Sequence, residues 1–293
     1  MMDDFWGEVF NFSDYGALLV LVQNSIIAGA LLGIVGGLIG PFVMSRDLAF
    51  AVHGISELSF AGAAAALLLG VNVVAGSLVG SLAAAALIGV LGTRARDRNS
   101  VTAVLTPFGL GLGILFLALY DGRTANKFGL LTGQIIAVDN PQLGLLVIVS
   151  VIVIVGVLLI WRPLTFASVD EDVARARGVP VDALGIGFMV LLGLATAVSI
   201  QIVGALLVLA LLVTPAAAAM RVTSSPLVTP LLAVVFAVVS VVGGILLAIG
   251  GGLPVSPYIT TISFLIWLVC RVVGARRVPA RRPMVSGGAI HAD

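Results

Sequence analysis

Charged residues are scarce in this sequence of 293 residues, where they make up only 10% of the total. Soluble domains carry about 25% charged residues. Hydrophobic residues account for 60% of the chain, the mean hydropathy is +1.21, and several apolar runs are long enough to cross a bilayer, which takes about 20 helical residues. The composition excludes a soluble enzyme. It predicts an all-α, polytopic transmembrane helical bundle surrounded by lipid, with no nucleic acid among its partners.

Cysteine is almost absent as well. The only cysteine is Cys270, so an internal disulfide and a metal site built from several thiolates are both excluded. The sequence also lacks a G-x-x-x-x-G-K-[ST] loop, which cradles the phosphates of ATP in P-loop ATPases. The chain is therefore not expected to hydrolyse ATP itself, and no permanently bound cofactor is expected.

Long apolar stretches are what the sequence has in abundance. Residues 16–274 are expected to form the transmembrane domain, between an N-terminal segment of residues 1–15 and a flexible basic tail of residues 275–293. Because the N-terminus is acidic and has no basic n-region, the first apolar run is expected to remain as a span. Residues 182–220 can form either two spans or one long broken helix, so nine spans are expected and eight is the alternative. The candidate spans are 16–43, 48–70, 73–92, 101–120, 141–161, 182–199, 201–220, 227–249 and 256–274.

The basic residues indicate the orientation of these spans. With the N-terminus outside and the C-terminus in the cytoplasm, all of the 15 basic residues except Arg123 and Lys127 fall in cytoplasmic loops or the tail. This is the asymmetry of the positive-inside rule. An odd number of spans fits it, whereas an even number requires a short or re-entrant segment.

Glycine is frequent inside the first span. Small residues let membrane helices approach one another closely, so helix packing is the expected role of these glycines. They are Gly29, Gly33, Gly36, Gly37 and Gly40. The run Gly250–Gly252 before "LPVSP" predicts a turn instead.

His53 and Glu57 are the ionisable residues that we place well inside a span, because the only other histidine, His291, lies in the tail. Residues four apart on a helix share one face, with Cβ atoms about 5–6 Å apart. An imidazole nitrogen and a carboxylate oxygen can then bind one cation at roughly 2.0–2.2 Å. Ionisable groups inside a bilayer are costly and usually line a pathway. Three roles stay open: a metal site, a proton relay, and a hydrogen-bonded pair that locks two helices.

A metal site at this pair needs further ligands. One span supplies two, whereas a tetrahedral site takes four. A symmetric dimer would bring a second His53 and a second Glu57, because a two-fold interface repeats the same surface. The spacing is H-x-x-x-E and not HExxH, and no second histidine lies in the spans, so an intramembrane zinc protease is poorly supported.

The long cytoplasmic loop at residues 162–181 contains a short predicted helix. Ser168 is expected to cap it, and the acids at 170–172 in its first turn suit the helix dipole. Two arginines near its end and Gly178 after it predict where the helix stops. A short, well-capped helix on the cytoplasmic face suits docking to another protein; the alternative is an ordinary amphipathic connector.

Four stretches together resemble the membrane subunit of the ATP-binding-cassette metal importers for zinc and manganese. "RDLAFAVHGISELSFAG" is similar to the helix in which that family carries D-A-L-S-H, and "FGLLTGQIIAV" is similar to F-L-F-G-x-I-L. "SVDEDVARARGVP" resembles the coupling segment F-D-x-x-x-A-x-x-x-G. The fourth place is "VGALLVLALLVTPAAAAM", which resembles G-x-L-L-V-x-A-L-L-x-x-P-A-A-x-A and is followed by "LPVSPYI" where the family has L-P-x-G-x-x-I. His53 and Glu57 stand where the family has Asp and His, so the ligand types are kept in reversed order with a longer carboxylate.

The resemblance implies the permease subunit of an ATP-driven importer in the bacterial plasma membrane. Its partners would be a second copy of the chain, cytoplasmic ABC ATPase subunits and an extracytoplasmic metal-binding protein. His53 and Glu57 would form a transient site at the dimer axis for zinc or manganese, with iron as a further candidate, because no thiolate narrows the choice. The alternative is an ATP-independent, proton-coupled carrier with Glu57 as the relay. The residues implied in ATPase coupling are Ser168, Asp170, Glu171, Ala174 and Gly178.

Overall fold

The computed structural model describes residues 21–92, 95–122, 138–204, 208–249 and 255–277, together with Gly16 and Leu19. Within these stretches the chain is helical and has no strand, which confirms the predicted all-α class. The helices are α3 (Gln23–Ser45), α4 (Ala49–Leu69), α5 (Val73–Leu91), α6 (Ala95–Leu119), α8 (Asn140–Val169), α9 (Glu171–Ala176), α10 (Val181–Val203), α11 (Val208–Leu212), α12 (Thr214–Val222), α13 (Val228–Ile249) and α14 (Val255–Arg277).

Eight of the described helices are long and apolar enough to cross a membrane. The predicted span at 201–220 is not a ninth, because it contains the short helices α11 and α12, which together cover only Val208–Val222. α10 ends at Gly204, whose φ of +83° favours glycine. Pro215 in the first turn of α12 has no N–H with which to continue α11. The described residues thus contain eight long apolar helices, as the alternative count had it. They do not form one long broken helix over 182–220, because α10 starts and α12 ends at the same end of the bundle.

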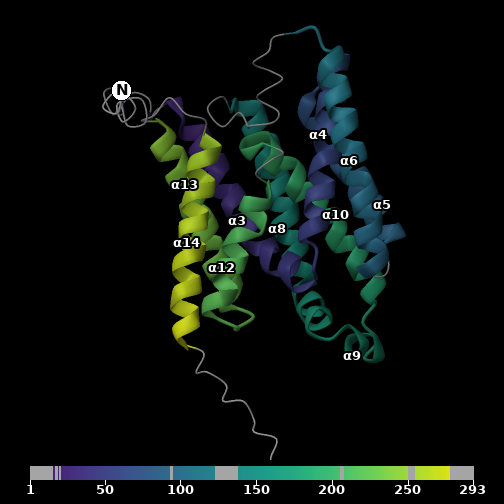
Figure 1. Cartoon of the computed structure of the whole chain (residues 1–293), viewed down its shortest axis with the longest axis vertical. Helices are drawn as coiled ribbons and strands as arrows, with labels where there is room; N and C mark the ends of the chain where they lie inside the picture. Colours follow the sequence, from purple (N-terminus) through teal and green to yellow (C-terminus); the bar gives the residue numbers. More distant parts are fainter. Residues whose placement is uncertain are drawn as a thin grey trace, which may run out of the picture.

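The helices run alternately up and down the bundle (Figure 1). The last turns of α3, α5 and α8 and the first turns of α4, α6 and α10 all line one cavity next to α9, so they lie at the same end. A second cavity adds the last turn of α12 and the first turn of α13 to this end. α14 also finishes there, since Gly274 packs against the backbone carbonyl of Arg221. The short α11–α12 pair thus returns the chain to the end from which α10 starts.

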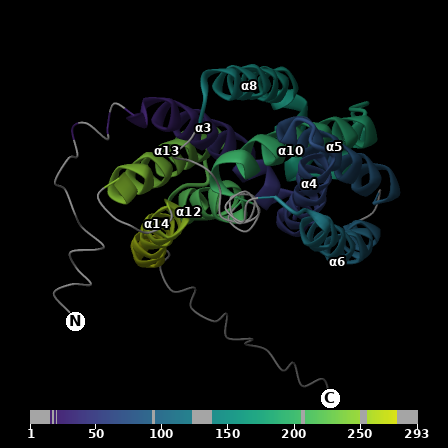
Figure 2. The same ribbon diagram turned by 90° about the horizontal axis from the view of Figure 1, so that it is seen from above.

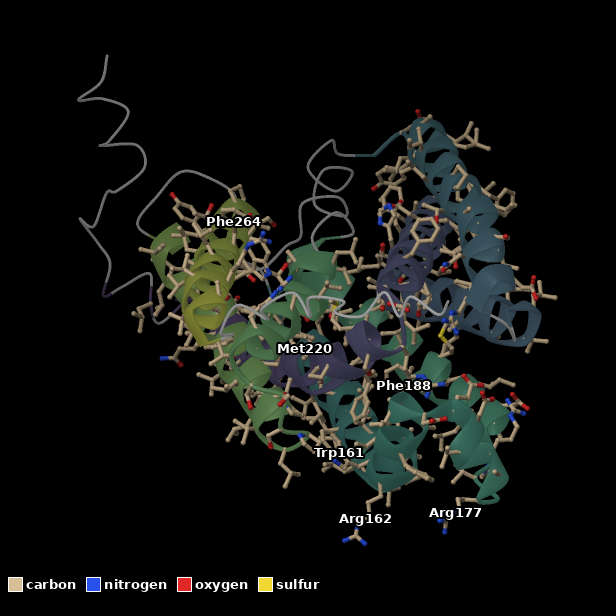
Figure 3. The ribbon with its side chains drawn as sticks, turned by 60° about the horizontal axis from the view of Figure 1, so that its bottom comes forward. Trp161, Arg162, Arg177, Phe188, Met220 and Phe264 are labelled. Carbon is tan, nitrogen blue, oxygen red and sulfur yellow. The ribbon has the colours of Figure 1, made fainter. Side chains whose placement is uncertain are left out.

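The arginines with described side chains gather at this end of the bundle, which we call the basic end. Figure 3 shows two of them, Arg162 and Arg177, pointing away from the bundle. The clustering agrees with the loop asymmetry of the sequence, so the basic end is the one that we expect to face the cytoplasm. Arg123 and Lys127, the two predicted exceptions, lie outside the described residues.

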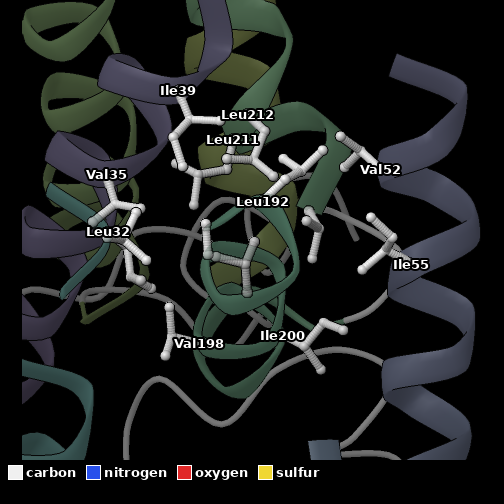
Figure 4. Close-up of a cluster of buried hydrophobic side chains, with 14 of the residues drawn as sticks. Leu32, Val35, Ile39, Val52, Ile55, Leu192, Val198, Ile200, Leu211 and Leu212 are labelled. Carbon is white, nitrogen blue, oxygen red and sulfur yellow. The ribbon is translucent and has the colours of Figure 1, made fainter. Parts of the chain in front are cut away.

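Two groups of helices flank a central one (Figure 2). α3 packs on α13, α12 packs on α13 and α14, and α4 packs on α5 and α6, while α10 contacts members of both groups. Phe42 of α3 meets Trp161 of α8 edge to face, with ring centroids 4.9 Å apart, which ties these helices together near the basic end. The close-up in Figure 4 shows the packed centre, formed by Leu32, Val35, Ile39, Val52, Ile55, Leu192, Val198, Ile200, Leu211 and Leu212.

The glycines of α3 allow its close approach to other helices, as the sequence predicted. A Cβ atom on Gly33 would lie 2.8 Å from the Cα of Val238 in α13, closer than real Cβ atoms come. Gly40 faces α12 instead, where an added Cβ would collide with the carbonyl oxygen of Leu212 at the α11–α12 break. Small residues thus let α3 contact the backbone of two neighbours, and such packing is a main source of helix association in membranes.

Candidate metal site and coupling helix

The predicted pair lies on α4, and the backbone there is held from two sides. α4 ends at Gly70, whose φ of +69° is left-handed and lets Val71 N–H bond back to the carbonyl of Ala66. On α6, a Cβ added to Gly109 would lie 3.0 Å from the carbonyl carbon of Glu57. α6 therefore rests directly on the backbone of the candidate ligand.

The two side chains share one face of α4, as their spacing predicted. Nδ1 of His53 and Oε1 of Glu57 are 3.8 Å apart, too far for a hydrogen bond. Two atoms about 2.1 Å from one ion at the tetrahedral angle lie about 3.4 Å apart. A small side-chain rotation is thus enough for both groups to bind one cation. The pair does not have the contact that a locked structural pair would show.

The two groups differ sharply in exposure. The side chain of Glu57 is 4% exposed, whereas that of His53 is 37% exposed in this single chain. The carboxylate is therefore shielded within the chain, and the imidazole is open to a neighbour. Among the described residues no group of three or more His, Cys, Asp or Glu side chains could hold a metal ion. His53 and Glu57 alone therefore offer two ligands, fewer than the four of a tetrahedral site.

The short helix in the predicted loop is present as α9, but its cap was wrongly predicted. Ser168 belongs to the last turns of α8 and donates its hydroxyl to the carbonyl of Leu164 at 2.7 Å. Asp170 is the cap instead, because its carboxylate accepts a hydrogen bond from the N–H of Val173 at 2.9 Å. α8 continues through Pro163 to Val169, so Ser168 still has a carbonyl four residues earlier to bond.

α9 stops where the sequence predicted. Gly178 has a φ of +82° and follows the last turn, which fits a glycine at this position. Ala174 is buried and packs in a small apolar cluster with Ala167 and Val181. Asp170 and Glu171, in contrast, are exposed. α9 therefore packs on the bundle through Ala174, and the acids of its first turn face outward.

Arg175 ties α9 to the start of α10. Its two terminal nitrogens donate to the two carboxylate oxygens of Asp182 at 2.9 and 3.0 Å, and Nη2 also donates to Oε1 of Glu171 at 3.2 Å. The hydrogen bonds with Asp182, and then the charge of Asp182, raise the pKa of Arg175 above its usual range. The forked arrangement orients α9 more strictly than a single bond would.

Sequence reasoning missed a charged cavity of about 300 Å³ between α9 and the ends of the transmembrane helices. Arg46, Arg98 and Glu171 are among the residues that line it. Arg46 and Arg98 are far apart in the sequence. The sequence alone predicted only that each lies in a cytoplasmic loop. Their common position follows from the packing of α3, α4 and α6, for which the sequence carries no local signal.

The comparison with protein families identifies the chain. A family model described as "ABC 3 transport family" matches residues 19–274. The chain belongs to the ABC 3 transport family. Together with the eight apolar helices, membership makes it a multi-pass membrane protein of bacterial type and a permease of the metal-transporting ABC class. The predicted family and membrane location are thereby confirmed.

Two relatives of the chain are named as manganese transport proteins. The chain is 30% identical over 225 residues to the manganese transport system membrane protein MntC of Halalkalibacterium halodurans, which covers 76% of this chain and 77% of that protein. It is 32% identical over 200 residues to the manganese import system permease protein ScaB of Streptococcus parasanguinis, covering 68% and 71% of the two chains.

Solved structures show the same fold. The structure of PsaBC from Streptococcus pneumoniae in complex with Fab superposes with a TM-score of 0.79 at 25% identity and covers 88% of this ABC 3 chain and 95% of that chain. An inward-facing putative metal-chelate type ABC transporter superposes with a TM-score of 0.70 at 16% identity. The stretch "FGLLTGQIIAV", which carried part of the predicted resemblance, lies outside the described residues except for its last residue, Val138.

Proposed function

We propose that this permease imports a divalent transition metal ion through a transient site at the axis of a dimer, with manganese as the first candidate and zinc or iron as the others. The single observation that carries the proposal is the half-site on α4. An exposed imidazole and a shielded carboxylate lie 3.8 Å apart on one helix face. Curated relatives named as manganese permeases support the choice of manganese.

A second copy would complete the coordination. A two-fold axis beside α4 would bring two copies of His53 and two of Glu57 together, giving two nitrogens and two carboxylates. Imidazole and carboxylate ligands suit manganese, iron and zinc, and the absence of thiolate disfavours softer ions such as Cu(I). Binding has to be weak enough to release the ion, as at any conduction site. A transient site of four ligands shared between two chains fits this requirement.

Two further partners follow from the proposal. The chain has no P-loop, so ATP would be hydrolysed by cytoplasmic ABC ATPase subunits that dock on the outward-facing acidic turn of α9. The implied coupling residues are those already placed: Asp170 and Glu171 on the exposed turn, Ala174 beneath it and Gly178 at its end, with Ser168 in the adjoining turn of α8. An extracytoplasmic metal-binding protein would deliver the ion to the opposite end of the bundle.

Reconstitution tests the proposal directly. The chain is co-purified with its ATPase, placed in proteoliposomes, and manganese uptake is followed with ATP, with a non-hydrolysable ATP analogue, and with the proton gradient collapsed. Strict dependence on hydrolysable ATP is the expected result. Uptake that follows a proton gradient without ATP would favour instead a proton-coupled carrier with Glu57 as relay and would overturn the proposal.

A further inference from the structure

The cavity beside α9 is lined by charges of both signs that come from separate segments of the chain. Arg46 lies in the turn between α3 and α4, and Arg98 lies near the start of α6. Glu171 opens α9 and lines the same cavity of about 300 Å³. Asp47 also lines it, but it is exposed and sits in the same turn as Arg46. Glu171 is thus the carboxylate that α9 brings to the two arginines.

The two guanidinium groups are incompletely bonded. Nη2 of Arg98 donates to the backbone carbonyl of Arg46 at 3.1 Å. Within the part of the chain that the structure describes, Nη1 of Arg46 and Nε of Arg98 are buried with no acceptor. Burial lowers the pKa of Arg46, and the charge of Glu171 acts against that shift. Buried donors without acceptors are costly. Among the described residues these two nitrogens lack an acceptor in this conformation, although Asp47, Glu171 and Asp182 line the same cavity. The two oxygens of Asp182 are already bonded to Arg175.

Glu171 has a different partner in this conformation. It acts electrostatically on both cavity arginines, yet its hydrogen bond goes to Arg175 of its own helix at 3.2 Å. That pair is exposed, with 51% and 57% of the two side chains accessible, and exposed ion pairs contribute little to stability. Arg175 also keeps its forked bond to Asp182 if Glu171 leaves. Releasing Glu171 therefore leaves no cation without a partner.

We propose that Arg46 and Arg98 are the residues through which the transmembrane helices receive the movement of α9. In a second conformation of the transport cycle, Glu171 exchanges Arg175 for this pair and the cavity closes. A helix with two alternative sets of ion pairs is a two-state element of the kind that switching proteins use. The inference rests on the proposed function, because it assigns the route by which α9 drives transport.

Each of the two arginines lies close to a helix that positions the His53–Glu57 pair. Arg46 lies directly before α4, which carries His53 and Glu57. Arg98 lies on α6, whose Gly109 rests on the backbone of Glu57. A displacement of the two arginines would therefore displace α4 and α6, the two helices that set the position of the Glu57 carboxylate.

A double-mutant cycle tests the exchange in the assembled complex. Glu171→Gln, Arg98→Gln and the double variant are reconstituted with the ATPase, and manganese ions imported per ATP hydrolysed are measured. The matched control is Asp97→Asn, an exposed acid in the first turn of α6 that neither lines the cavity nor belongs to the acidic turn of α9. We expect each single variant to lower the ratio about fivefold and the double variant to be no worse than either, since coupled residues are non-additive. The control is expected to stay within about twofold of wild type.

Charge reversal keeps the test decisive if Arg98→Gln folds poorly. Glu171→Arg and Arg98→Glu are each expected to abolish coupling, and their combination to restore at least about a third of it, because the exchanged pair can still form. Arg46→Gln with Glu171→Gln provides an independent cycle. Additive losses in both cycles, or an equal effect of Asp97→Asn, would overturn the exchange. If wild type itself imports no metal with ATP, it is the proposed function that has failed and not the exchange.

Discussion

Replacement of Glu57 by Gln separates the three roles that the sequence left open for the His53 pair. Gln keeps the length, the carbonyl oxygen and the shape of the side chain and removes only the negative charge. A structural pair tolerates this change, because the imidazole can still bond the amide. A metal site does not, because a divalent cation depends on the charge of its ligands. In a dimer both copies of Glu57 change at once, so the shared site loses two negative charges.

The burial of Glu57 sets the size of the loss. Its side chain is 4% exposed, so water screens its charge poorly. At an effective dielectric constant of about 20, a unit charge and a divalent ion about 4 Å apart interact by roughly 8 kcal/mol. Most of this attraction offsets the lost hydration of the ion. Even a remaining third corresponds to about 100-fold weaker binding, since each 1.4 kcal/mol is about tenfold.

Manganese uptake at a concentration near half-saturation for wild type is the assay, with and without ATP. We expect Glu57→Gln to reduce uptake about 100-fold or more at unchanged assembly with the ATPase. Asp97→Asn is the control for loss of an exposed carboxylate elsewhere on the chain. Uptake by Glu57→Gln within about threefold of wild type would refute the metal role of the pair. If wild-type uptake requires a proton gradient and no ATP, and Glu57→Gln abolishes it, Glu57 is a proton relay.

Three other changes test separate parts of the structure. His53→Ala removes the exposed half of the site and is expected to abolish uptake while co-purification with the ATPase persists; normal uptake would rule out the imidazole as a ligand. Charge reversal of both Asp170 and Glu171 is expected to let ATP hydrolysis continue without transport, and unchanged coupling in vesicles would place the docking surface elsewhere. Gly40→Ala is expected to cost about 1–3 kcal/mol by overpacking, because its Cβ would collide with the backbone at the α11–α12 break. Thermal unfolding measures this against Gly111→Ala, where an added Cβ meets nothing within 4 Å, and equal stability of the two variants would contradict the packing.

The sequence by itself determined the membrane class, the helical spans and the position of the candidate pair. These features depend on local composition and on spacing along one helix. A charge content of 10% and long apolar runs leave few alternatives to a helical bundle. His53 and Glu57 are one turn apart, so they share a face of α4 whatever its neighbours are. The end of α9 at Gly178 was equally local, because a left-handed residue after a helix favours glycine.

The break between α10 and α12 and the cap of α9 were decided by longer-range structure. Residues 201–220 are apolar enough for a span, but Gly204 and Pro215 interrupt the chain where α3 packs against it. Ser168 is a good cap in sequence, yet α8 continues past Pro163 and gives its hydroxyl a carbonyl to bond. In both cases two local preferences competed, and the sequence alone did not show which one would prevail.

Only the tertiary structure could bring together the charges that the coupling proposal uses. Arg46, Arg98 and Glu171 belong to three segments whose spacing in sequence carries no common period. Their meeting at one cavity depends on the end of α3 and the starts of α6 and α9 lying at the same end of the bundle. The unequal exposure of His53 and Glu57 has the same origin, because burial is set by neighbouring helices and not by the residues of α4 alone.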